Sequence, residues 1–127
     1  MKHKISIHVP NAGNIIVELD GDQSPDTVRK IIAALPFKAK ANIWGKEVYT
    51  DPIPVETKEE NATLDVSLFD AAYWPPGRAI CLFYGPTPLD KEKITPYSPV
   101  NIIGKIRNPD KAILTKIDGA QITFESI

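Results

Sequence analysis

The stretch AYWPPGRAICLFYGPTP at residues 72–88 decides the fold. Its centre, residues 79–84, is a nearly continuous apolar run, which is typical of a fully buried strand. Proline-rich turns bound this run at 75–77 and 85–88. Because proline cannot donate a hydrogen bond to a β-ladder, such turns fix where a strand ends. The stretch therefore predicts a central buried strand between two rigid turns.

Alternation of apolar and polar residues predicts further strands on both sides of this centre. The twelve prolines are spread between these segments rather than clustered, as expected for strands separated by turns. The turn residues PNAGN predict that the first two strands pair as a hairpin. The predicted strands are residues 5–9, 15–19, 39–43, 46–49, 53–55, 64–68, 79–84, 100–106, 113–117 and 122–124.

One helix is predicted, starting at Ser24-Pro25-Asp26. The serine oxygen can accept from a free amide, proline at the first position loses no hydrogen bond, and the aspartate complements the helix dipole. Apolar residues then follow helical spacing at positions 28, 31, 32 and 35, and Pro36 ends the helix. Short strands with one helix in the N-terminal half favour a mainly β protein, a closed eight-stranded barrel in which residues 1–127 form a single domain. Side chains fill the interior of such a barrel, so a ligand site is expected on its outside or mouth.

The bulk properties exclude several classes of function. The net charge of −1 gives no basis for binding nucleic acid, and no apolar run is long enough to span a membrane. The single Cys81 excludes an internal disulfide, and the N-terminus lacks the apolar core of a signal peptide. A cytoplasmic location is therefore expected. The chain has neither a nucleophile-elbow motif nor a glycine-rich phosphate loop, so no cofactor is predicted.

The stretch at 72–88, together with SPVNIIGKI at 98–106 and IWGKEVYTDPIPV at 43–55, resembles a family of small archaeal and bacterial cyclophilin-like proteins of uncharacterised function. The resemblance extends over nearly the whole chain and implies a cyclophilin-like barrel. True cyclophilins isomerise X-Pro bonds with an arginine in an F-H-R-x-I-x-x-F-x-x-Q-G-G motif. Neither the motif nor an arginine occurs at the corresponding segment here, since the only arginines are Arg29, Arg78 and Arg107. A typical prolyl isomerase site is therefore not expected.

No metal site is predicted, because His3, His8 and Cys81 do not have the spacing of a ligand set. Cys81 lies in the apolar run and is interpreted as a core residue. Glu47 leaves two interpretations open. In WGKEVY it lies between Trp44 and Tyr49, where desolvation could raise its pKa and make it an acid, a base or a ligand anchor. It could equally be a surface strand residue paired with a lysine.

The remaining candidate residues belong to a predicted aromatic groove with a proline-fixed rim. Trp74 and its Pro-Pro-Gly turn could instead be purely structural, and the amide of Asn101 could tie down the rim or meet a ligand. The predicted site consists of Trp44, Glu47, Tyr49, Tyr73, Trp74, Phe83, Tyr84, Gly85, Thr87 and Asn101.

The sequence leaves three hypotheses for the function. The first is a binding module for a small molecule or a proline-containing peptide. The second is an enzyme, either a divergent prolyl isomerase or an acid–base catalyst that uses Glu47. The third is an assembly protein whose aromatic patch joins copies into a homo-oligomer. Binding is the interpretation that the sequence favours.

Overall fold

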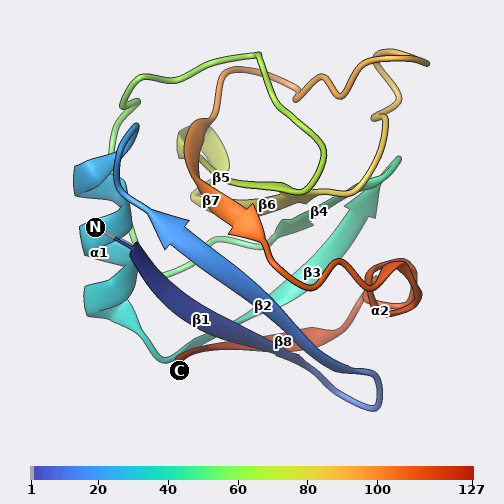
Figure 1. The fold of residues 1–127 in the computed structure, drawn as a ribbon, viewed down its shortest axis with the longest axis horizontal. Helices are drawn as coiled ribbons and strands as arrows, with labels where there is room; N and C mark the ends of the chain where they lie inside the picture. Colours follow the sequence, from blue (N-terminus) through green and yellow to red (C-terminus); the bar gives the residue numbers. More distant parts are fainter. Residues whose placement is uncertain (1) are drawn as a thin grey trace.

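The computed structural model describes residues 2–127 and shows a closed antiparallel barrel of eight strands with a helix near each end (Figure 1). The strands follow one another around the barrel in the order β1-β2-β7-β5-β6-β4-β3-β8. They are β1 (Lys2–Val9), β2 (Gly13–Asp20), β3 (Phe37–Trp44), β4 (Glu47–Thr50), β5 (Asp70–Trp74), β6 (Ala79–Phe83), β7 (Asn101–Ile106) and β8 (Gln121–Ser126). The helices are α1 (Pro25–Ala34) and α2 (Lys111–Thr115). The predicted mainly β, eight-stranded barrel is confirmed.

The predicted hairpin is formed by β1 and β2, with Ile5 opposite Val17 and Ile7 opposite Ile15. These side chains are buried, while their neighbours along each strand are mostly less buried. The turn contains Asn11 at φ 64°, a left-handed conformation that asparagine tolerates better than most residues. The period-two pattern of the sequence therefore sets which face of each strand enters the barrel.

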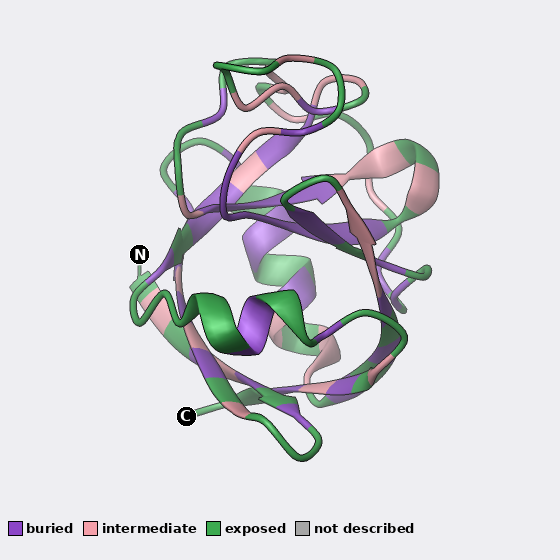
Figure 2. Cartoon of the chain, turned by 90° about the vertical axis from the view of Figure 1, so that its right-hand side faces the viewer, coloured by how far each residue is buried: buried purple, intermediate pink, exposed green. Residues whose placement is uncertain are grey.

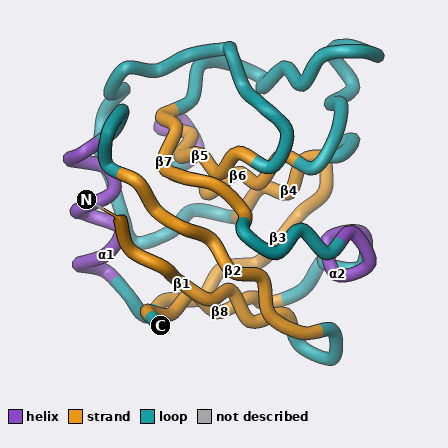
Figure 3. Tube along the Cα trace, viewed as in Figure 1, coloured by secondary structure: helices purple, strands orange, loops and turns teal. Residues whose placement is uncertain are grey.

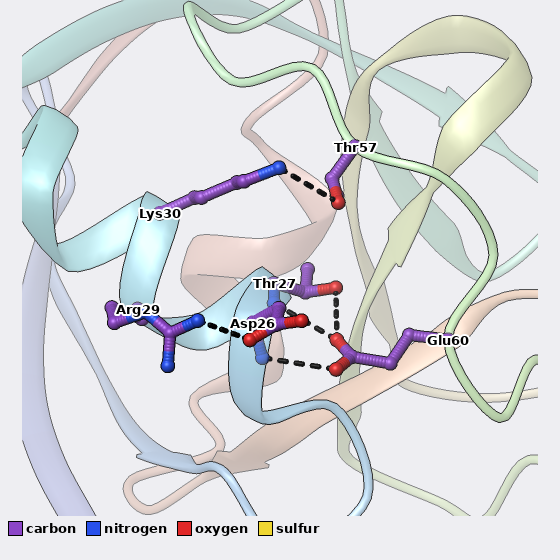
Figure 4. A network of polar contacts seen from close by, with 6 residues as sticks. All are labelled: Asp26, Thr27, Arg29, Lys30, Thr57 and Glu60. Atoms are coloured by element: carbon purple, nitrogen blue, oxygen red, sulfur yellow. Dashed lines mark hydrogen bonds and ion pairs between the residues drawn. The ribbon is translucent and has the colours of Figure 1, made fainter.

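Helix α1 begins at Pro25 as predicted, but the predicted serine cap is wrong. Ser24 makes no side-chain cap and donates instead to the carbonyl of Glu60 at 3.2 Å. The carboxylate of Glu60 accepts from the amides of Asp26 and Thr27 at 3.0 and 2.9 Å and from the Thr27 hydroxyl at 2.8 Å (Figure 4). Burial alone would raise the pKa of Glu60, but these hydrogen bonds outweigh it and lower the pKa. A residue distant in sequence thus caps the helix and anchors its own loop.

The predicted strand at 113–117 and the expectation of a single helix are wrong, because residues 111–115 form α2. Asp110 caps this helix by accepting from the amides of Ala112 and Ile113. Ile113, Leu114 and Ile117 are all buried, at a spacing that suits one helical face better than a strand. The Asn-Pro-Asp sequence before them is therefore a helix start.

The segments 53–55 and 64–68 are not strands either, although Ile53, Val55 and Val66 are buried as a strand pattern would require. They belong to a long connection between β4 and β5, in which Thr63 makes one isolated bridge to Val100. The strand missed by the sequence interpretation is β5. Buried apolar residues in a loop give the same local pattern as a short strand, because the pattern reports burial and not pairing.

Two hydrophobic cores result from this arrangement. The larger fills the barrel and takes in the inner faces of α1 and α2, as the buried segments around the ring show (Figure 2). The smaller lies outside the barrel, where two long connections cross the outer face of β5, β6 and the start of β7 (Figure 3). This outer core comprises Val66, Ala72, Cys81, Phe83 and Val100, with Trp74, Ile94 and Ile102 packed against it. Within residues 2–127, neither helix has the length and apolar character needed to cross a membrane.

Candidate functional site

A pocket of about 250 Å³ opens beside the outer core. It is formed by the ends of β3 and β5, the outer faces of β4 and β6, and the connection before β7. Its walls are mainly apolar. The residues that line it are Trp44, Glu47, Tyr49, Trp74, Cys81, Pro96, Tyr97 and Val100.

Four aromatic side chains line this pocket, and three of them, Trp44, Trp74 and Tyr97, contact one another. The ring of Tyr97 meets Trp44 edge-on, with centroids 6.2 Å apart and planes at 74°. It meets Trp74 in the same manner, at 6.0 Å and 86°. Such edge-to-face contacts are a favoured aromatic geometry. The indole N–H of Trp74 donates to the hydroxyl of Ser98 at 2.6 Å, which fixes the tryptophan against the Tyr97 segment.

Among the described residues that line the pocket, Glu47 is the one with a carboxyl group. The register of β3 and β4 places it opposite Trp44, and the register of β4 and β6 places it opposite Phe83. Glu47 is only 6% exposed, and its Oε1 has no hydrogen-bond partner. Burial raises its pKa from 4.5 to about 7, and a hydrogen bond with the Cys81 side chain lowers it by less. The interpretation of Glu47 as a surface residue paired with a lysine is therefore wrong.

Cys81 combines its predicted place in the core with a place in the pocket lining. It is 2% exposed, and burial raises the pKa of its thiol well above the ordinary value. The nearby Glu47 carboxyl raises it further. Because the thiolate is the reactive form of cysteine, Cys81 is a poor nucleophile in this setting.

Four of the predicted site residues meet at this pocket, namely Trp44, Glu47, Tyr49 and Trp74. The other predicted aromatic residues do not. Tyr73 points into the barrel core and donates its hydroxyl to the carbonyl of Val55 at 2.8 Å. Tyr84 also belongs to the barrel core, and Phe83 is fully buried in the outer core. The predicted convergence of five aromatic residues is thus replaced by a smaller cluster that includes Tyr97.

Asn101 is fully buried and holds the connection between β4 and β5. Its side chain accepts from the amide of Glu60 at 2.8 Å and donates to the hydroxyl of Thr27 and the carbonyl of Lys58, each at 3.1 Å. The sequence left two roles open for this amide, tying down the rim or contacting a ligand. In the structure it contacts neither the rim nor the pocket. Asn101 ties a different loop to α1.

The predicted rim, residues 85–88, is pinned to the barrel rather than free. Thr87 is buried, and its hydroxyl donates to the carbonyl of Thr95 across the connection. A Cβ at Gly85 would lie 2.5 Å from the side chain of Lys46, so glycine lets this lysine pack over the backbone. Neither residue lines the pocket, but both position the connection that carries Tyr97.

Sequence reasoning missed Tyr97, Pro96 and Val100, and did not place Cys81 in a site. The apolar run at 79–83 concealed the two faces of β6, since Ile80 and Leu82 enter the barrel core while Cys81 enters the outer core. Tyr97 follows a proline in the long connection, and only its distance from Trp44 and Trp74 in the folded chain identifies it.

Gly77 supports the Trp74 wall, because a Cβ there would lie 2.6 Å from the indole ring. The change Gly77→Ala is expected to displace the ring and shift the tryptophan emission, while stability changes by less than about 1 kcal/mol. The measurement uses a Trp44→Phe background, so that Trp74 is the sole emitter. Trp44 emission in a Trp74→Phe background is the control and should not move. Unchanged Trp74 emission would show that the ring does not rest on Gly77.

Metal binding finds no support in the described part of the chain. No group of three or more histidine, cysteine, aspartate or glutamate side chains within residues 2–127 is placed to hold a metal ion.

Comparison with solved structures gives two informative similarities. The solution structure of the hypothetical protein AF2241 from Archaeoglobus fulgidus matches with a TM-score of 0.84 and 42% identity, over 99% of this chain and 95% of that one. The structure of McbB in complex with tryptophan matches with a TM-score of 0.74 and 17% identity, over 96% of this chain and 44% of that one. At that identity, McbB shows a shared fold only. A search of curated proteins gave no match.

The family comparison agrees with the structure. The model of the family described as cyclophilin-like matches residues 3–125, which span the barrel from β1 to β8. The resemblance seen in the sequence is therefore confirmed, and this chain belongs to the cyclophilin-like family.

Proposed function

We propose that this barrel is a binding module, and that its ligand is a small molecule or a single side chain of a peptide held among Trp44, Trp74 and Tyr97. The observation that carries the proposal is a mainly apolar pocket lined by Glu47, a carboxyl residue whose buried Oε1 has no hydrogen-bond partner. Ligand sites commonly combine apolar walls with a few placed polar groups. A volume of about 250 Å³ suits a small ligand, since pockets for drug-sized ligands have volumes of roughly 300–1,000 Å³.

The walls of the pocket favour binding because they are already ordered. Trp74 is held by Ser98, and the connection that carries Tyr97 is held by the bond between Thr87 and Thr95. A preformed site loses less conformational entropy when a ligand enters.

Tryptophan emission reports directly on ligand binding, because Trp44 and Trp74 are the only tryptophans of the chain and both line the pocket. Indole, L-tryptophan and acetyl-Ala-Pro-amide serve as probes, and a fragment screen by NMR widens the set. L-Tryptophan is included because the fold relative McbB was solved with it. Sedimentation under the same conditions would show whether a second copy of the chain competes for the pocket.

Replacing Trp74 or Tyr97 by alanine is expected to weaken binding of a pocket ligand roughly tenfold or more, because each removes an aromatic wall. Tyr97 is 73% exposed, so the Tyr97→Ala variant should keep its fold. Leu68→Ala removes an exposed apolar side chain outside the pocket and is the matched control. If both pocket variants bind every fragment found as well as the parent protein does, the pocket is not the binding site. If the screen finds no ligand, the proposed function fails.

A second candidate, acid–base catalysis, rests on the pKa of Glu47. A carboxyl group with a pKa of about 7 is suited to take up and release a proton near neutral pH. No arginine lines the pocket in the described chain, and Arg78 lies at a different depression, beside Pro76. The other enzyme candidate, a divergent prolyl isomerase, is tested by a protease-coupled assay with a proline peptide, because uncatalysed isomerisation takes roughly tens to hundreds of seconds. Acid–base activity should be lost in Glu47→Gln, and activity that survives in this variant excludes Glu47 as its catalyst.

A further inference from the structure

The buried carboxyl of Glu47 has no charge partner. None of the ion pairs formed within residues 2–127 includes it, and no lysine or arginine is among the residues that line its pocket. The neighbouring cation, Lys46, packs its side chain over Gly85 instead. An ionised carboxylate is strongly disfavoured in an apolar site unless a positive charge accompanies it.

The aromatic groups around this carboxyl are of the kind that attracts cations. The faces of tryptophan and tyrosine rings carry negative electrostatic potential, and sites for quaternary ammonium groups are built from several such rings. Here Tyr97 stands edge-on to both Trp44 and Trp74, so the three rings do not stack on one another. An edge-to-face contact covers one face of one ring in each pair, so these two contacts leave the other faces of the three rings uncovered.

We propose that the ligand of this pocket is a small organic cation, an alkyl- or methylammonium group that the three aromatic rings surround and the free oxygen of Glu47 neutralises. The inference rests on the proposed binding function and names its ligand class. It is carried by the unpartnered oxygen of Glu47, a residue that lines an aromatic pocket without a cationic residue. An anionic ligand would meet no positive group there.

The protonation state of Glu47 distinguishes a cation from a neutral ligand. Without a ligand, burial raises the pKa of Glu47 to about 7, so the group holds its proton in mildly acid solution. A cation binds the ionised form and should bind more tightly as the pH rises through about 7. A ligand that accepts a hydrogen bond, such as a peptide carbonyl, uses the protonated form and should bind more tightly as the pH falls.

Few other groups near Glu47 could produce such a pH dependence. The titratable groups that share its pocket are the Cys81 thiol on β6, the Tyr49 phenol on β4 and the Tyr97 phenol on the long connection. Trp44 on β3 and Phe83 on β6, the two residues in register with Glu47, do not titrate. The pKa of Cys81 is raised well above its ordinary value, so this thiol stays protonated near neutral pH.

The test compares choline with 3,3-dimethylbutan-1-ol, a neutral molecule of the same shape in which carbon replaces the charged nitrogen. Binding of each is followed by tryptophan emission and by NMR at about pH 5 and about pH 8, with constant ionic strength. Choline is expected to bind roughly tenfold more tightly than the alcohol at the higher pH. Its affinity is expected to fall roughly tenfold or more at the lower pH. The alcohol should not bind more tightly at the higher pH.

Glu47→Gln should remove the pH dependence of choline binding and weaken it at the higher pH to the level of the alcohol. The pH comparison on the parent protein stands alone if this variant does not fold. Equal binding of the two molecules, tighter choline binding at the lower pH, or no choline binding would each overturn the cation inference. The proposed binding function would survive those results if the fragment screen finds a neutral ligand that depends on Tyr97. It fails separately if no ligand is found.

Discussion

Glu47→Gln is expected to abolish a loss of stability of about 3 kcal/mol that the parent protein shows as the pH rises from about 4.5 to about 7. The pKa of Glu47 is higher in the folded protein than in the unfolded chain, so the unfolded chain releases this proton at lower pH. Between the two pKa values the folded state holds more protons, and stability falls with rising pH by about 1.4 kcal/mol per pH unit. Above about pH 7 the loss is complete, and below about pH 4.5 it is absent.

Urea unfolding of both proteins at about pH 5 and about pH 8 measures this effect. The slope with pH is the quantity to compare, because the glutamine amide has its own cost of burial at every pH. Glu59→Gln, which alters an exposed carboxyl, is the control and should keep the parent slope. Glu60 and Asp90 do not interfere: hydrogen bonds lower the pKa of both, so their contributions are lost only as the solution becomes more acid. An unchanged slope in Glu47→Gln would mean that Glu47 is not buried in the folded protein.

Gly104→Ala is expected to destabilise the protein by about 3 kcal/mol or more, because it prevents the close approach of β2 and β7. A Cβ at this position would lie 2.0 Å from the carbonyl oxygen of Glu18, which belongs to the backbone and cannot rotate away. The two strands pair at only three positions, with Gly104 opposite Leu19. Any movement that relieves the clash therefore opens the barrel at a short seam.

Chemical unfolding of Gly104→Ala and Gly119→Ala separates this clash from other effects of adding a methyl group. A Cβ at Gly119 would meet nothing within 4 Å, but its φ of +82° is unfavourable for alanine. The free energy of unfolding of that variant should fall by only about 1 kcal/mol, because of backbone strain. Equal losses in the two variants would show that β2 and β7 can separate slightly without cost.

Much of the barrel could be predicted from local pattern. The buried faces of β1 and β2 follow a period of two, and α1 begins at Pro25 and ends at Ala34, two residues before Pro36. Both signals come from residues close together in the sequence. The errors arose where this local pattern was ambiguous. Residues 64–68 and 113–117 carry apolar residues that a strand, a loop or a helix can each bury, and only pairing partners distinguish these states.

Less of the candidate site than of the barrel could be predicted from the sequence. The sequence could identify four of the pocket residues, because these aromatic and carboxyl side chains lie next to glycine or proline turns. They are Trp44, Glu47, Tyr49 and Trp74. Tyr73 and Tyr84 were placed with them wrongly, since their side chains enter the barrel core. Which face of a buried strand a residue takes is set by register with its neighbours, and register is not local.

The stretch at 72–88 by itself determined a central buried strand, because its apolar run is bounded by proline turns, and the alternating segments on both sides then determined the class of fold. Tertiary structure alone decided what the strand presents to its surroundings. Pairing of β6 with β4 and β5 turned Cys81 outward beside Glu47, and the long connection then brought Tyr97 over them. That pocket depends on contacts between residues about 50 apart in sequence, such as Trp44 and Tyr97, and no pattern within a single strand encodes them.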